Sequence, residues 1–176
     1  MVSRLSTTPD ITDAVIRAGL QNTWWPLRFE IQRRKNAPSV ILDAAHNVDS
    51  AHALTATLRE SGYQPDNLTL IFAASADKDV QGMLQTFLPF FSTVILTRFV
   101  GNPRSVPPDQ LSELASHSGN ARDCRILIAQ DPTTALALAD RQTPEGGTIC
   151  ATGSLFLASE VRRLLTPDSP FSTEDK

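Results

Sequence analysis

Two patterns of hydrophobic residues alternate along this chain. Compact hydrophobic runs predict strands, and they lie at 29–33, 40–43, 68–73, 93–97, 125–129 and 148–151. Longer stretches carry hydrophobic residues every three or four positions, which predicts helices at 47–61, 80–88, 107–117, 133–140 and 153–165. Strands alternating with helices indicate βαβ units with right-handed crossovers. We therefore predict an α/β, Rossmann-like three-layer fold, with a mostly parallel sheet of about six strands and helices on both faces.

The first 26 residues differ from this alternating part. Four hydrophobic residues recur there at helical spacing, namely Ile11, Val15, Ile16 and Leu20. Gly19 lies near the end of this predicted helix, and Pro26 disfavours helix in the residue before it. We expect a leading segment with one short helix over 1–26 and an α/β domain over 27–165. The polar tail at 166–176 contains two prolines and is predicted to be disordered.

Composition is typical of a soluble globular protein with one domain. The chain has 176 residues, of which 41% are hydrophobic and 20% charged, and its formal net charge is −3. This balance argues against a nucleic-acid-binding surface, and no hydrophobic run is long enough to cross a membrane. Residues 1–10 lack the core of a signal peptide, so we expect a cytoplasmic protein. Cys124 and Cys150 are far apart and are predicted to be free buried thiols.

Polar side chains gather where the predicted strands end. In parallel α/β sheets, ligands bind outside the carboxyl ends of the strands. The segments at those positions are 43–47, 74–79, 98–104 and 152–154, and they are rich in groups that contact nucleotides or carboxylates. The sequence therefore places the candidate site at this edge of the sheet.

The segment 43–47 offers a carboxylate and an imidazole in one turn. Asp43 can accept hydrogen bonds from ribose hydroxyls, and His46 can donate one to a phosphate oxygen. The alternative is that Asp43 or Asn47 caps the next helix and that His46 packs in the turn. The spacing alone leaves both interpretations open.

Three further residues each have a functional and a structural interpretation. Arg28 carries a guanidinium that suits phosphate, but it can also be an ordinary surface arginine. Lys78, between two aspartates, can pair with a substrate carboxylate or belong to a solvated helix cap. Ser154 begins a predicted helix, where free N–H groups favour an anion, or it is only the cap itself.

Motifs for other chemistries are absent from the sequence. It has no G-x-x-x-x-G-K-[ST] phosphate loop, no G-x-G-x-x-G fingerprint, no G-x-S-x-G elbow and no histidine–cysteine cluster with metal-ligand spacing. A complete site for splitting ATP is therefore not encoded in these residues.

Four motifs, spread from residue 25 to residue 162, resemble those of one protein family. The segment 25–30, WPLRFE, resembles the W-P-G-R-x-E pattern of the C-terminal domain in folylpolyglutamate and dihydrofolate synthases, which belong to the Mur ligase superfamily. The segment 42–47, LDAAHN, resembles their L-D-G-A-H-N, and DKD at 77–79 matches their D-K-D. GSLFL at 153–157, with EVR at 160–162, is similar to their G-S-L-Y-L…E-V-R.

The resemblance implies a reaction and a nucleotide site. With ATP and Mg²⁺, such enzymes phosphorylate a substrate carboxylate, and the amine of glutamate attacks the acyl phosphate to form an amide. Arg28 would reach the ATP phosphates as a catalytic residue. Asp43 would hold the ribose. His46 and Asn47 would complete the nucleotide site, Asn47 by shaping the turn.

The resemblance also implies partners. Lys78 and Ser154 would bind glutamate, and residues 1–26 would be an interdomain linker. The phosphate loop, the metal ligands and much of the site for folate or dihydropteroate would lie in an N-terminal ATPase domain, so we expect no metal site in this fragment and no catalysis by it alone. No nucleic acid or membrane partner is expected. The alternative is a stand-alone Rossmann-like module that binds a nucleotide or a partner without ligase activity.

Several positions depart from the family pattern, among them Ala158 and Ser159, where the family often has Val-Gly. Leu27 and Ala44 stand where the family has glycine, Val48 where proline is common, and Phe156 where tyrosine is usual. None of these changes removes a group assigned to chemistry. Leu27 is expected to restrain the backbone of the linker, because a side chain disfavours conformations open to glycine.

Overall fold

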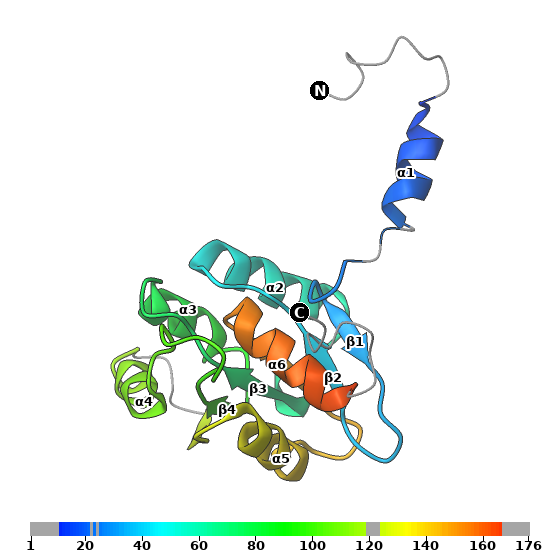
Figure 1. Ribbon diagram of the computed structural model, residues 1–176. Helices are drawn as coiled ribbons and strands as arrows, with labels where there is room; N and C mark the ends of the chain where they lie inside the picture. Colours follow the sequence, from blue (N-terminus) through cyan, green and yellow to red (C-terminus); the bar gives the residue numbers. More distant parts are fainter. Residues whose placement is uncertain (1–10, 22, 24, 119–123, 167–176) are drawn as a thin grey trace, which may run out of the picture.

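The centre of the computed structural model, which describes residues 11–21, 23, 25–118 and 124–166, is a six-stranded sheet (Figure 1). Its strands are ordered β1-β2-β6-β3-β4-β5. Their bounds are, in that order, Glu30–Gln32, Ser39–Leu42, Thr148–Thr152, Leu68–Phe72, Thr93–Leu96 and Arg125–Ile128. β1 pairs antiparallel with β2, and the other neighbouring pairs are parallel. The predicted mostly parallel sheet is confirmed.

Helices cover both faces of the sheet. One layer contains α2 (Val48–Glu60), α3 (Val80–Phe87) and α4 (Pro108–Ser116). The other contains α5 (Pro132–Gln142) and α6 (Leu155–Leu165), which lie together in Figure 1. A short 3₁₀ helix, Pro65–Asn67, precedes β3. The three layers confirm the predicted fold, and every residue of β3 and β6 is buried because these strands are covered on both sides.

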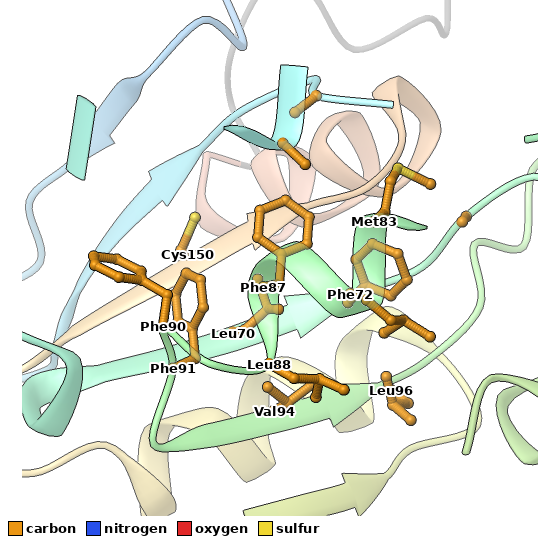
Figure 2. Close-up of a cluster of buried hydrophobic side chains, with 14 of the residues drawn as sticks. Leu70, Phe72, Met83, Phe87, Leu88, Phe90, Phe91, Val94, Leu96 and Cys150 are labelled. Atoms are coloured by element: carbon orange, nitrogen blue, oxygen red, sulfur yellow. The ribbon is translucent and has the colours of Figure 1, made fainter. Parts of the chain in front are cut away.

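The two faces of the sheet are packed with different side chains. Under α2, α3 and α4 the core contains a group of phenylalanines among aliphatic side chains, and Figure 2 shows the rings of Phe72, Phe87 and Phe91 gathered there. Phe87 makes edge contacts with both of the other rings. Cys150 lies in this cluster as a free thiol, and burial raises its pKa. Under α5 and α6, alanines and aliphatic side chains predominate.

The glycine that follows β6 sets the geometry of the site edge. Gly153 has a φ of 101°, and a Cβ atom there would lie 2.4 Å from the carbonyl oxygen of Ala73. Its amide donates to the carbonyl of Ala45 over 3.0 Å. The ends of β2, β3 and β6 are therefore drawn together at the position where α6 begins.

The predicted leading helix is present as α1, Asp13–Gln21, and it stands away from the sheet (Figure 1). Residues 11–20 are all exposed, and Leu20 exposes 72% of its surface. Of the predicted disordered tail at 166–176, only Thr166 is described, and the remainder lies outside the described residues. None of the described helices is long and apolar enough to span a membrane.

Candidate functional site

The Arg28 turn, residues 27–30, connects the leading segment to β1. Leu27 and Phe29 have positive φ angles, 60° and 50°, which are unfavourable for residues with a Cβ atom. Arg28 is exposed between them, and its guanidinium carbon lies 5.8 Å from the centre of the Trp25 ring. The turn therefore presents a cation to solvent from an unfavourable backbone conformation.

Three hydrogen bonds hold the Arg28 turn in this conformation. The amide of Phe29 donates to Oδ2 of Asp43 over 2.9 Å, and the amide of Ala44 donates to the carbonyl of Leu27 over 2.9 Å. The amide of Leu27 donates to Oε2 of Glu30 over 3.0 Å. Two of these bonds join the turn to the loop after β2. β1 and β2 lie between these two segments in the sequence.

An ion pair continues this network into α6. Nε of Arg162 lies 2.9 Å from Oε1 and 3.2 Å from Oε2 of Glu30, and the two side chains expose 14% and 7% of their surface. Burial by itself raises the pKa of Glu30, but hydrogen bonds from the Leu27 amide, Arg162 and Gln32 lower the pKa overall. Glu30 is thus held as an anion between the turn and the last helix.

Asp43, directly after β2, is half-buried and has two backbone partners. Its Oδ2 accepts from Phe29, and its Oδ1 accepts from the amide of Ala45 over 2.8 Å. Burial raises the pKa of Asp43, and the two amides and the charge of Arg28 oppose that rise only in part. Each carboxylate oxygen keeps a second lone pair. The residue can therefore both fix the turn and accept from an additional donor.

The neighbours of Asp43 have distinct roles. Asn47 caps α2: its Oδ1 accepts from the amide of Ser50 over 2.8 Å, and Oγ of Ser50 accepts from the amide of Asn47 over 3.1 Å. Nδ1 of the exposed His46 lies 2.9 Å from the carbonyl oxygen of Ala44. Because a carbonyl only accepts, Nδ1 carries the proton, and in the neutral ring Nε2 is an acceptor. Donation from Nε2 to a phosphate therefore requires the doubly protonated ring.

A hollow of about 240 Å³ brings Arg28 and Asp43 together. Its wall is completed by α2, and its lining residues are Arg28, Phe29, Asp43, Ser50, Ala53, Leu54 and Thr57. A guanidinium and a carboxylate at one small opening suit a ligand that carries both anionic and hydroxyl groups.

The Lys78 turn, residues 77–79, leads from β3 to α3 and is exposed. Nζ of Lys78 lies 3.1 Å from Oδ2 of Asp77, and Lys78 exposes 38% of its side chain. Asp79 caps α3 by accepting from the amide of Gly82 over 2.9 Å. Lys78 lines a second hollow of about 240 Å³. Because its ion pair with Asp77 is exposed to solvent, Lys78 can exchange this partner for another carboxylate.

Ser154 is the N-cap of α6 and is buried, with 4% of its surface exposed. Its Oγ accepts from the amide of Phe156 over 3.2 Å. It lines neither the hollow of Arg28 nor that of Lys78. The structure thus joins Arg28 and Asp43, and it places Lys78 and Ser154 separately from that pair.

Three charged residues of the motifs have contacts for which the sequence pattern predicts no role: Glu30, Glu160 and Arg162. The carboxylate of Glu160 accepts from the amides of Val100, over 2.9 Å, and Gly101, over 2.6 Å. The only sequence feature that could have suggested the Glu30–Arg162 pair is that the first and last motifs carry opposite charges. Their proximity depends on α6 lying beside β2, which a motif does not encode.

Another cavity lies at the amino-terminal ends of β2 and β6, away from these residues. It has a volume of about 580 Å³ and lies between the turn before β2 and the turn before β6. Within the described ranges, no group of three or more histidine, cysteine, aspartate or glutamate side chains is placed to hold a metal ion.

Comparison with known proteins identifies a family for most of this fold. The family described as "Mur ligase, glutamate ligase domain" matches residues 27–155. A folylpolyglutamate synthase of Lacticaseibacillus casei is 35% identical over 155 residues, which is 88% of this chain and 33% of that protein. A probable bifunctional folylpolyglutamate synthase/dihydropteroate synthase of Haloferax volcanii is 33% identical over 159 residues, or 90% of this chain and 18% of that protein.

Solved structures agree with this assignment. Folylpolyglutamate synthase of Mycobacterium tuberculosis, crystallised with ADP and AMPPCP, superposes with a TM-score of 0.78 at 29% identity, covering 89% of this chain and 36% of that one. The enzyme of Thermotoga maritima gives a TM-score of 0.68 at 31% identity, with coverages of 90% and 35%. The chain thus spans about a third of the length of most of these relatives.

Proposed function

The chain belongs to the Mur ligase family of glutamate ligase domains, and from that premise we propose that it is the C-terminal domain of an ATP-dependent ligase that adds glutamate to a folate. The observation that carries this proposal is the shared hollow of Arg28 and Asp43 at the carboxyl edge of the sheet. Nucleotides bind at this edge in α/β folds. The relative from M. tuberculosis was crystallised with ADP and AMPPCP, which supports a nucleotide as the ligand.

In the proposed reaction, the γ-phosphoryl group of ATP passes to a carboxylate of the folate substrate, giving an acyl phosphate and ADP. The amine of glutamate then attacks the acyl carbon, an amide forms and phosphate leaves. Arg28 would stabilise the negative charge on the transferring phosphoryl group. Its exposure on the turn allows the guanidinium to reach a phosphate held by another domain.

Three residues would bind the nucleotide beside Arg28. Asp43 would accept from a ribose hydroxyl with the lone pairs that the amides of Phe29 and Ala45 leave available. His46, whose Nδ1 is taken up by the carbonyl of Ala44, would lie against the nucleotide with its Nε2. Asn47 would act indirectly, since its capping bonds fix the start of α2.

The glutamate would lie nearer β3 and α6. Lys78 would exchange its contact with Asp77 for a substrate carboxylate. Ser154 would act by fixing the start of α6, where free backbone amides favour an anion, because its own Oγ is occupied by the cap.

Magnesium and the phosphate loop would come from a separate ATPase domain. Among the described residues, the chemistry of the donor set does not fit a metal site, because no cluster of ligands is present. We propose that α1 and the exposed Trp25 belong to the linker that meets this domain, since their hydrophobic side chains are uncovered. Residues 27–165 would then form the glutamate ligase domain, working in the cytoplasm.

The test compares ADP release by this chain alone with release by the chain joined to an ATPase domain. That domain can be any encoded upstream of Met1, or the corresponding part of the L. casei relative. The expected result is glutamate- and folate-dependent ADP release from the joined polypeptide only. Arg28→Ala should lower kcat about 1,000-fold, the scale of an arginine that stabilises phosphoryl transfer.

Arg141→Ala provides the matched control, because Arg141 is an exposed arginine on α5. It should leave ADP release unchanged. If the joined polypeptide binds ADP but releases none from ATP with any pterin acceptor, the ligase proposal fails and a nucleotide-binding module takes its place.

A further inference from the structure

The Arg28 turn has a conformation that its own residues do not favour. Leu27 and Phe29 both occupy the left-handed region, at φ angles of 60° and 50°. Such a conformation persists only where surrounding contacts impose it, and strained backbone of this kind often occurs at functional sites. The contacts that impose it here determine where the guanidinium of Arg28 can lie.

Glu30 joins the turn to the body of the domain. One of its carboxylate oxygens, Oε2, accepts from the amide of Leu27 over 3.0 Å. Both oxygens accept from Nε–H of Arg162, over 2.9 Å at Oε1 and 3.2 Å at Oε2. A single carboxylate therefore connects the residue before Arg28 with a helix that is 132 positions away in the sequence.

The helix that supplies Arg162 is itself firmly anchored. Leu157, Ala158 and Val161 of α6 are fully buried against the sheet. Two residues before Arg162, the carboxylate of Glu160 accepts from the amides of Val100 and Gly101. The backbone of α6 that carries Arg162 is therefore held firmly against the sheet. The hydrogen bonds from Nε of Arg162 then restrict the orientation of the Glu30 carboxylate.

From these contacts we infer that Glu30 and Arg162 are positioning residues that hold Arg28 where it meets the phosphates of the nucleotide. This inference rests on the proposed ligase function, in which Arg28 is the catalytic residue. Neither residue lines the surface hollow, and the Glu30 side chain is 7% exposed, so their route to Arg28 runs through the Arg28 turn. Asp43 holds the other end of the same turn through the amide of Phe29.

The first measurement is amide hydrogen exchange of the 176-residue chain. In Glu30→Gln and in the double variant Glu30→Leu/Arg162→Met, the Leu27 amide should exchange about tenfold faster or more, because a bond to a charged acceptor is lost or weakened. The double variant removes both charges of this ion pair together and puts apolar side chains in their place. Core amides such as those of β3 should accelerate less than the Leu27 amide, and by no more than the fall in the free energy of unfolding allows. Unchanged exchange at Leu27 in both variants would overturn the inference.

The second measurement is a cycle of variants in the joined polypeptide that carries ATPase activity. With Arg28 present, Glu30→Gln should lower kcat about tenfold and leave KM for ATP and glutamate within about twofold. In the Arg28→Ala background, Glu30→Gln should not lower kcat further, because Glu30 affects catalysis only by positioning Arg28. A loss confined to stability would instead lower the rate in both backgrounds.

Arg163→Ala is the matched control, because Arg163 is the exposed neighbour of Arg162 on α6. It should change neither exchange at Leu27 nor kcat. Equal losses from Glu30→Gln with and without Arg28 overturn the positioning role while leaving the ligase function standing. Absence of turnover in every joined polypeptide removes the ligase function itself, and with it the role of Arg28.

Discussion

The two charged turns at the carboxyl edge of the sheet, the Arg28 turn and the Lys78 turn, are held in opposite ways. The Arg28 turn depends on distant partners, through Asp43 in the loop after β2 and Arg162 in α6. The Lys78 turn is held locally: Lys78 pairs with its neighbour Asp77, and Asp79 caps the helix that follows it. One cation therefore stands on a turn whose backbone conformation is imposed, whereas the other has an exposed and exchangeable contact.

This difference suits the two proposed tasks. Stabilising a transferring phosphoryl group requires a guanidinium fixed in advance, because reorganisation at the moment of reaction adds to the barrier. Binding a free amino acid tolerates a cation that leaves one carboxylate for another. A fixed arginine and an adaptable lysine at one edge are what a ligase with both steps would need.

The largest expected effect is the loss of the Glu30 carboxylate. Glu30→Ala removes the acceptor of the Leu27 amide and breaks the shielded ion pair with Arg162, so we expect the free energy of unfolding to fall by about 3 kcal/mol. Urea denaturation measures it. Glu113→Ala, an exposed glutamate on α4, should change the free energy by no more than about 0.5 kcal/mol. Equal effects of the two substitutions would remove the distinction between the turns.

Replacing Asp43 should cause the second largest loss of stability. Asp43→Ala deprives the amides of Phe29 and Ala45 of their acceptors, and we expect a loss of about 1–3 kcal/mol. Denaturation of this variant and of Asp109→Ala, an exposed aspartate in the first turn of α4, provides the comparison. A loss no larger than that of the control would show that the tie between the loop after β2 and the Arg28 turn contributes nothing.

The two carboxylates should respond to pH with opposite sign. Hydrogen bonds hold the pKa of Glu30 below its ordinary value, despite burial, so its stabilisation is complete above the ordinary pKa of glutamate and is lost as the pH falls toward the lowered one. Burial raises the pKa of Asp43, so the unfolded chain releases this proton first, and stability declines as the pH rises from the ordinary value to the raised one.

Unfolding free energies measured against pH for the wild type, Glu30→Gln and Asp43→Asn test these signs. The difference between wild type and Glu30→Gln should rise with pH, and that between wild type and Asp43→Asn should fall. Slopes of the same sign would contradict the assignment of one carboxylate to a bonded pair and of the other to a desolvated site.

Leu27 allows a smaller and sharper test of the imposed conformation. Glycine normally destabilises relative to alanine, but at the φ of 60° found here the left-handed region penalises any Cβ atom. We expect Leu27→Gly to be more stable than Leu27→Ala by about 1 kcal/mol. Both variants lose the burial of the leucine side chain, so this comparison isolates the backbone. The opposite order in thermal denaturation would show that the turn is not strained.

Much of this architecture was predictable from hydrophobic pattern alone. The strands and helices lie where runs and periodic stretches predicted them, because β3 and β6 are buried on both faces and α3 on one. The placement of residues at strand ends followed from the same reasoning. Residues 43–47 do follow β2, and Asn47 caps α2 as its structural interpretation proposed.

Contacts across the sheet were beyond such reasoning. The Glu30–Arg162 pair joins residues whose proximity depends on strand order, and the sequence pattern specifies strands without their order. Likewise, the pattern of 27–30 does not reveal positive φ angles at two residues that disfavour them. Whether Lys78 and Ser154 share one ligand also depends on loop geometry, and the structure places them in separate surroundings.

The smallest expected effect on stability belongs to Lys78, and it completes the comparison. Its contact with Asp77 is exposed, so Lys78→Ala should leave the urea midpoint of the chain unchanged. In the joined polypeptide, KM for glutamate should rise about tenfold or more, because a charged contact to a carboxylate is lost, while KM for ATP should stay constant. Lys35→Ala, in the turn before β2, is the exposed lysine that serves as control. A fall in the midpoint without a change in KM for glutamate would make Lys78 part of the scaffold, and the two turns would then differ in exposure but not in task.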